Sequence, residues 1–129
     1  MAYPDSYRYT KEHEWISVDG TAASVGITDY AQDSLGDIVF VELPKVGDAL
    51  EAGKTFGSVE SVKAVSDLFS PVSGTVTAVN SELNDAPEKV NVDANHTWML
   101  KLTLKDAAEL NGLLSAADYE KFIAEETGH

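Results

Sequence analysis

Two strand-like runs meet at one lysine in the stretch Gly57-Ser58-Val59-Glu60-Ser61-Val62-Lys63-Ala64-Val65-Ser66-Asp67. The runs cover residues 56–62 and 64–70, and neither Gly nor Pro separates them at the junction. Two short strands joined by a tight turn form a β-hairpin, which would place Lys63 at an exposed tip. Such a lysine is open to a modifying enzyme, although most hairpin lysines are only solvated surface.

Strand and turn patterns continue on both sides of this hairpin. Asp19-Gly20 separates residues 13–18 from residues 21–27 and predicts a second hairpin. Thr28 can cap a helix over residues 29–35, which Gly36 would end. Further strands are expected at residues 37–43, 75–79 and 98–104, with a short segment at 49–51 between turns and a loop at 80–91. Aromatic residues in strand runs are usually buried, so the core should include Trp15, Phe40, Phe56 and Trp98.

The last part of the chain changes to helical spacing. Residues 105–114 and 115–126 are expected as helices, and Ser115 with Asp118 resembles a capping box. One apolar face can hold Leu114, Tyr119, Phe122 and Ile123. Many short strands followed by a helical tail predict a mainly β sandwich or barrel with appended helices. Residues 1–129 fit one domain, with a core at about 9–104 and a helical tail at about 105–126.

Composition excludes several classes of function. The net charge is −13 and Arg8 is the single arginine, so neither nucleic acid nor an anionic membrane is an expected partner. The chain has no cysteine, which removes thiol catalysis, disulfides and cysteine-based metal sites. Residues 1–5 do not form a secretory signal, and no apolar run approaches membrane-spanning length. A cytoplasmic protein is expected by default.

The residues around Lys63 resemble a lipoyl attachment motif, and the variant Glu60-Ser61-Val62-Lys63-Ala64 is similar to that of the glycine cleavage H proteins. The resemblance covers nearly the whole chain from about Tyr9 onward. It rests also on residues 12–15, 25–32, 35–44 and 70–76, on Asn91, Trp98 and Met99, and on residues 119–122.

The resemblance implies a barrel-sandwich hybrid of two antiparallel sheets, like a lipoyl domain, with lipoate held as an amide on Lys63. It implies a carrier rather than an enzyme. The carrier would take the aminomethyl group of glycine from a pyridoxal-phosphate glycine decarboxylase to a tetrahydrofolate-dependent aminomethyltransferase. Dihydrolipoamide dehydrogenase would then reoxidise it, and a lipoyl ligase or transferase would load it. A shuttle between several enzymes is most simply a monomer.

The family also folds its loaded arm into a surface cleft. By motif position, the resemblance implies Glu14 and Asp67 as cleft residues, with Glu12 and Ser34 as further candidates. Acidic side chains there would stabilise a basic aminomethyl group by charge-assisted hydrogen bonds. Read without the resemblance, Glu14 is an outward residue on the first strand and Asp67 is an exposed hairpin acid.

Two other functions remain open. An H-like carrier can pass lipoate to other enzymes instead. A small hydrolase using Glu14, Asp67 and His13 as acids and bases would be a different class. No metal site is expected, because His13, His96 and His129 lie far apart and pair with no cysteine.

Overall fold

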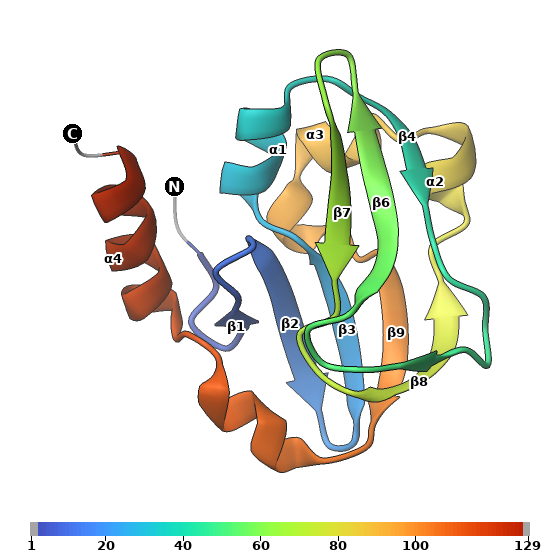
Figure 1. Cartoon of the computed structure of the whole chain (residues 1–129), viewed down its shortest axis with the longest axis vertical. Helices are drawn as coiled ribbons and strands as arrows, with labels where there is room; N and C mark the ends of the chain where they lie inside the picture. Colours follow the sequence, from blue (N-terminus) through green and yellow to red (C-terminus); the bar gives the residue numbers. More distant parts are fainter. Residues whose placement is uncertain (1–2, 128–129) are drawn as a thin grey trace.

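The chain folds into two antiparallel sheets in the computed structural model, which describes residues 3–127. The larger sheet contains, in spatial order, β1 (Arg8–Tyr9), β2 (Glu14–Asp19), β3 (Ala22–Ile27), β9 (Leu100–Leu104), β8 (Gly74–Val79) and β5 (Ala49–Leu50). The smaller contains β4 (Ile38–Glu42), β6 (Thr55–Ser61) and β7 (Val65–Phe69), with β6 in the centre. The sheets do not close into a barrel. The β6–β7 hairpin extends at one end of the molecule (Figure 1).

Local sequence signals produce the first hairpin and the first helix as predicted. In the β2–β3 pair Asp19 faces Ala22, and Gly20 adopts a φ of 67° that favours glycine in the turn. The helix α1 (Asp29–Leu35) has the predicted bounds. The side chain of Thr28 accepts a hydrogen bond from the backbone N–H of Ala31, and Gly36 ends the helix with a φ of 81°.

The main core lies between the two sheets. Alternate residues of the strands face inward, and Val25, Val59, Leu68 and Leu102 are each no more than 3% exposed.

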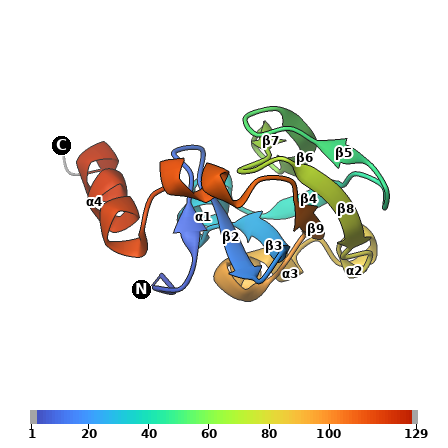
Figure 2. The same ribbon diagram turned by 90° about the horizontal axis from the view of Figure 1, so that it is seen from below.

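The tail forms a second, smaller core with the start of the chain. The tail consists of η2 (Ala107–Gly112) and α4 (Ala116–Thr127). Of these two elements, α4 packs against Tyr9 and Trp15. The predicted apolar face is confirmed, and the backbone N–H of Asp118 donates to Oγ of Ser115 at 3.2 Å. Viewed from below, α4 lies at one end of the molecule and the β6–β7 hairpin toward the other (Figure 2). Within residues 3–127, no helix is long and apolar enough to cross a membrane.

Residues 80–91 are not a loop, and that prediction was wrong. They contain α2 (Glu82–Asp85) and most of α3 (Lys89–Val92), and η1 (Ala94–His96) follows. The two α-helical segments bury Leu83 and Val90 under the sheets. Helices of four residues are too short for a periodic pattern, so tertiary burial rather than sequence spacing stabilises them.

Phe40 is not a core residue, which corrects a second prediction. Its side chain is 51% exposed, whereas Trp15 is 2% exposed and Phe56 is 7% exposed. The pairing of β4 with β6 slips between Ile38 and Phe40, so the strand's inward and outward alternation is broken there. The sequence gives no local signal for this bulge.

Candidate functional site: the Lys63 hairpin and a pocket beside Glu14

Lys63 lies at the tip of the β6–β7 hairpin, as predicted. Glu60 faces Val65 in the last strand pair before the turn, and the side chain of Lys63 is exposed. The side chain hydroxyl of Ser61 is buried in the turn. It accepts hydrogen bonds from the backbone N–H groups of Lys63 at 3.3 Å and Ala64 at 3.1 Å. The turn is therefore held from inside while the lysine side chain points outward.

A second set of contacts fixes the hairpin tip to the end of α1. The backbone N–H of Val62 donates to the carbonyl of Asp37 at 3.0 Å. The aliphatic part of the Lys63 side chain passes over Gly36, where an added Cβ would lie 3.4 Å from Cε of the lysine. The lysine side chain therefore lies against the end of α1, where Gly36 has a φ of 81° that favours glycine.

Glu14 is a buried carboxylate, not an outward strand residue. Its side chain is 1% exposed. The hydroxyl of Thr10 donates to Oε1 at 2.6 Å, and the backbone N–H of Phe69 donates to Oε2 at 3.2 Å. Burial raises the pKa of Glu14 to about 7, against the lowering effect of these two hydrogen bonds. Near neutral pH this carboxyl group therefore exists in both protonation states.

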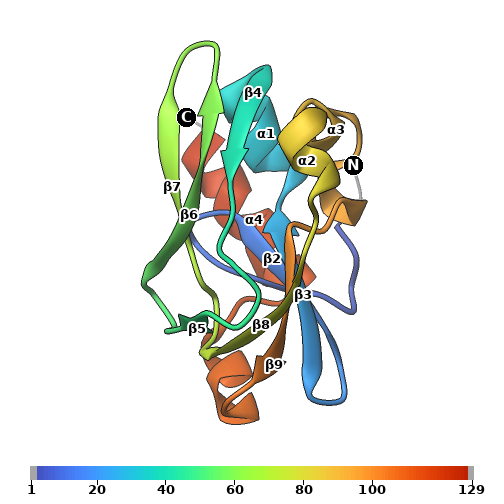
Figure 3. The ribbon, with the colours of Figure 1, turned by 90° about the vertical axis from the view of Figure 1, so that its right-hand side faces the viewer.

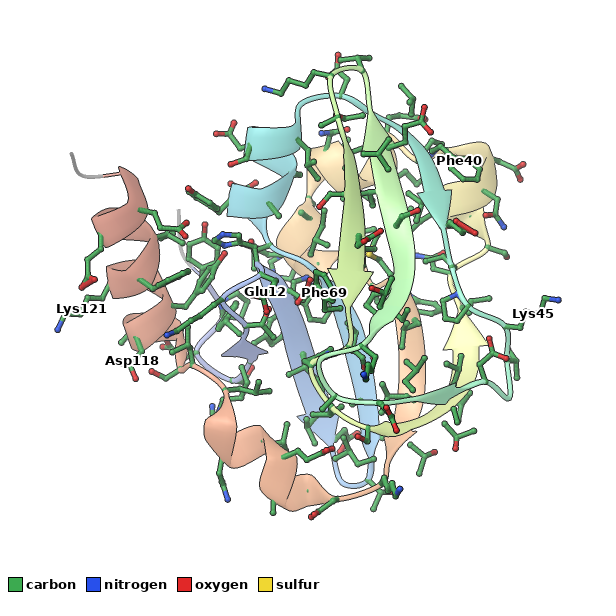
Figure 4. The ribbon with its side chains drawn as sticks, viewed as in Figure 1. Glu12, Phe40, Lys45, Phe69, Asp118 and Lys121 are labelled. Atoms are coloured by element: carbon green, nitrogen blue, oxygen red, sulfur yellow. The ribbon has the colours of Figure 1, made fainter. Side chains whose placement is uncertain are left out.

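A pocket of about 280 Å³ opens beside Glu14. Glu12 and Phe69 also line it, and both are labelled close together in Figure 4, beside the lower end of β7. Its other lining residues come from the start of the chain, the segments after β5 and β7, and the tail: Tyr9, Thr10, Lys11, Gly53, Ser70, Pro71, Gly112, Leu113 and Leu114. The pocket thus combines an apolar wall with two acidic side chains.

The other two predicted cleft residues lie elsewhere. Asp67 faces outward from β7 opposite Ser58, and it lines a separate surface hollow that includes Glu42. Ser34 is exposed on α1. The structure therefore brings Glu14 and Glu12 together at one pocket, but places Asp67 and Ser34 outside its lining.

Lys63 and the pocket occupy the two ends of β7. Lys63 and Phe69 are six positions apart in the sequence, which is roughly 20 Å along an extended strand. The lysine and the pocket are therefore separate features of the same hairpin.

The sequence reasoning missed Thr10. Thr10 and Glu14 are four residues apart, but the chain reverses between them at His13, whose φ is 71°. Such a conformation is uncommon for a residue other than glycine, and no pattern in the sequence predicts it.

His13 and His96 are the two histidines within residues 3–127. Within residues 3–127, no group of three or more metal-ligating side chains is close enough to hold an ion. Nδ1 of His13 instead lies 2.8 Å from the hydroxyl of Tyr119, and Nε2 lies 3.3 Å from a carboxylate oxygen of Glu126. His13 therefore contributes to the attachment of α4, and His129 lies outside the described residues.

Comparison with known proteins gives one consistent result. The family model described as "Glycine cleavage H-protein" matches residues 7–126. Glycine cleavage system H proteins from Acidobacterium capsulatum and Koribacter versatilis are each 70% identical over 129 residues, covering the full length of both chains. The crystal structure of a glycine cleavage system H protein from Mycobacterium marinum superposes with a TM-score of 0.85 at 37% identity, covering 98% of this chain and 99% of that one. With its two sheets, its lysine-tipped hairpin and these similarities along its whole length, the chain belongs to the glycine cleavage H-protein family.

Proposed function

We propose that this chain holds lipoate as an amide on Nζ of Lys63 and carries the aminomethyl group of glycine between the enzymes of the glycine cleavage system. Membership of the family implies a lipoyl carrier role in that system. The observation that carries the proposal is the exposed Lys63 side chain on a turn fixed by Ser61 and backed by Gly36. An amide there removes the charge of the lysine and lengthens its reach without disturbing a buried contact.

Lipoate supplies a disulfide that can be reduced and can hold a one-carbon amine, which a chain without cysteine cannot supply itself. The residues of the chain would anchor and shelter that cargo. Lys63 provides the only covalent attachment in this proposal. Glu14, with Glu12 in the lining of the same pocket, offers an acidic site for a basic amine. Asp67 and Ser34 remain candidates for contacts on the outer surface.

The proposed partners follow from the cycle. A glycine decarboxylase, an aminomethyltransferase and dihydrolipoamide dehydrogenase would each receive the arm in turn, and a lipoyl ligase or transferase would load it. The chain would act as a monomeric carrier without catalysis of its own. A cytoplasmic location belongs to the same proposal, because the similar glycine cleavage proteins come from bacteria.

The deciding experiment is an intact-mass measurement on the full chain after incubation with lipoate, ATP and a lipoyl ligase. One lipoyl increment is expected on the peptide that contains Lys63. Lys63→Arg should abolish the increment, because a guanidinium group is not an acyl acceptor under these conditions. Lys54→Arg is the matched control, because Lys54 is also exposed and precedes the same strand, β6, at its opposite end.

Activity follows as a second measurement. The loaded chain should support glycine-dependent release of CO₂ by a glycine decarboxylase, and Lys63→Arg should not. Loading with no support of that reaction would favour transfer of lipoate to other enzymes. An increment on any other lysine, or none at all, would contradict the proposal.

A further inference from the structure

Two consecutive apolar side chains of β4 face solvent. Val39 is 49% exposed and Phe40 is 51% exposed, whereas Ile38 and Val41 on either side are buried. In a regular strand only one of two neighbours would point outward. The bulge between Ile38 and Phe40 puts both on the outer face of the smaller sheet, so this part of the strand presents more apolar surface than alternation alone would give.

These residues continue toward the lysine across the strand pairs. Phe40 faces Glu60 on β6, and Glu60 in turn faces Val65 on β7, so the three lie in one row on the same face. Val65 is 68% exposed and Val62, next to the lysine, is 71% exposed. We call Val39, Phe40, Val62 and Val65 the tip patch. Figure 3 shows β4 beside β6 at the hairpin end, and Figure 4 labels Phe40 on the outer edge of β4.

Acidic residues accompany the tip patch. Glu60 lies within its central row, and Glu42 and Asp67 flank Ser58 in the next row of the same sheet face. An apolar surface with an acidic border fits a partner that presents apolar side chains with basic residues around them.

We propose that the tip patch is the docking surface for the enzyme that acylates Lys63. This inference rests on the proposed function, because it assumes that Lys63 is the acylated residue. An acylating enzyme must bring its reacting carbonyl to the lysine amine itself, within the length of one side chain. Its surface must therefore touch the residues around the tip. Enzymes that act on the far end of a long arm have no such requirement.

The chemistry of that step explains why close docking matters. The enzyme supplies an activated lipoyl group as an acyl adenylate. The neutral amine of Lys63 attacks the carbonyl carbon, the new N–C bond forms, and the bond from that carbon to the phosphate oxygen breaks. AMP leaves with the electron pair, and the amine loses its extra proton to a base or to water. Attack needs the amine nitrogen and the carbonyl carbon to be aligned about 3 Å apart. A small misplacement of the hairpin on the enzyme therefore lowers the rate of acylation strongly.

The test compares exposed valines of the same chain. Val39→Ser removes apolar surface from the tip patch, and Val46→Ser is its matched control, because Val46 is 62% exposed but lies outside the strands of the smaller sheet. Phe40→Ala removes the aromatic side chain of the tip patch from β4. Val65→Ser tests the same patch from β7 without touching the bulge. All four side chains are exposed, so circular dichroism and the thermal midpoint should change little.

Acylation of each variant is followed by mass with a lipoyl ligase, lipoate and ATP, over a range of carrier concentrations. We expect kcat/KM to fall about tenfold for Phe40→Ala and for Val39→Ser combined with Val65→Ser, mainly through a higher KM. The kcat/KM of Val46→Ser should equal that of the unmodified sequence. Equal kcat/KM for all variants would overturn the docking inference and leave the proposed function intact, whereas failure to acylate the unmodified sequence would overturn the proposed function itself.

Discussion

The hydroxyl of Thr10 donates a 2.6 Å hydrogen bond to Oε1 of Glu14, and the backbone N–H of Glu14 donates a 3.0 Å hydrogen bond to the same hydroxyl oxygen. The two bonds close a small ring across the chain reversal at His13. They fix the carboxyl group before any ligand enters the pocket. Thr10 is thus a positioning residue for Glu14.

Replacement of Thr10 by Val should raise the pKa of Glu14 further above its present value of about 7, because a hydrogen bond to the ionised form is lost. The free energy of unfolding should fall by about 1–2 kcal/mol. NMR titration of the Glu14 side chain and urea denaturation would measure the two effects. Thr10→Ser keeps the hydroxyl and should preserve the pKa; an equal shift in both variants would contradict the hydrogen-bond explanation.

Glu14 should make the protein less stable as pH rises. Its pKa is about 7 in the folded state against an ordinary value of 4.5, so between these values the folded state binds the proton that the unfolded state releases. Stability from this group is therefore full below about pH 4.5 and is lost as pH rises to about 7, with a slope of at most about 1.4 kcal/mol per pH unit. Urea denaturation across this range should show a smaller loss for Glu14→Gln.

The comparison with Glu14→Gln is needed because His13 acts in the opposite direction. Burial lowers the pKa of His13 below 6.5, so this group reduces stability as pH falls. The difference between the two proteins at each pH cancels the His13 contribution. Identical pH profiles would show that Glu14 is ionised normally.

Ser61→Ala should loosen the hairpin turn without unfolding the protein. The substitution removes the buried acceptor for the N–H groups of Lys63 and Ala64, but the backbone hydrogen bond from Ser61 to the carbonyl of Ala64 remains. We expect a loss of about 0.5–1.5 kcal/mol in the free energy of unfolding, with faster amide exchange at both residues. Ser66→Ala on β7 is the control. Unchanged exchange at Lys63 and Ala64 would show that the serine does not hold the turn.

Gly57→Ala should be strongly destabilising. A Cβ on Gly57 would overlap the backbone carbonyl oxygen of Glu42 on β4, and a backbone atom paired in a sheet cannot easily move. We expect a loss of about 3 kcal/mol in the free energy of unfolding. Gly112→Ala has open space around the added carbon and should change stability by less than about 0.5 kcal/mol in urea denaturation. Similar losses for the two variants would rule out a steric cause.

Elements with strong local signals were predictable from the sequence. The Asp19-Gly20 turn and the α1 helix need only a few neighbouring residues, and the helix bounds agree residue for residue. The strand β1 was missed because it has only two residues, and its pairing depends on β2 and on Leu114 far along the chain. Short elements stabilised by distant partners leave no periodic pattern to detect.

The candidate site also has one part that was predictable from the sequence and one part that was not. The position of Lys63 at a hairpin tip follows from two strand runs with a junction between them. The burial of Glu14 does not follow from the sequence. Strand alternation predicts that neighbouring residues of β2 alternate between buried and exposed, whereas three consecutive residues from Glu14 to Ile16 are buried. Trp15 is covered by the second core around Tyr119, whereas Glu14 and Ile16 point to the other side of β2. There Ile16 enters the main core, and Glu14 is hydrogen-bonded to Thr10 and to the backbone of Phe69.

The paired hydrogen bonds between Tyr9 and Leu114, 2.8 Å each way, bear on the order of folding. Both residues line the pocket beside Glu14, yet they stand near opposite ends of the chain. During synthesis the β6–β7 hairpin can form as soon as its own residues have emerged, whereas this pocket wall must wait for the last part of the chain. In a newly made chain the turn that carries Lys63 can therefore form before the pocket beside Glu14 is complete.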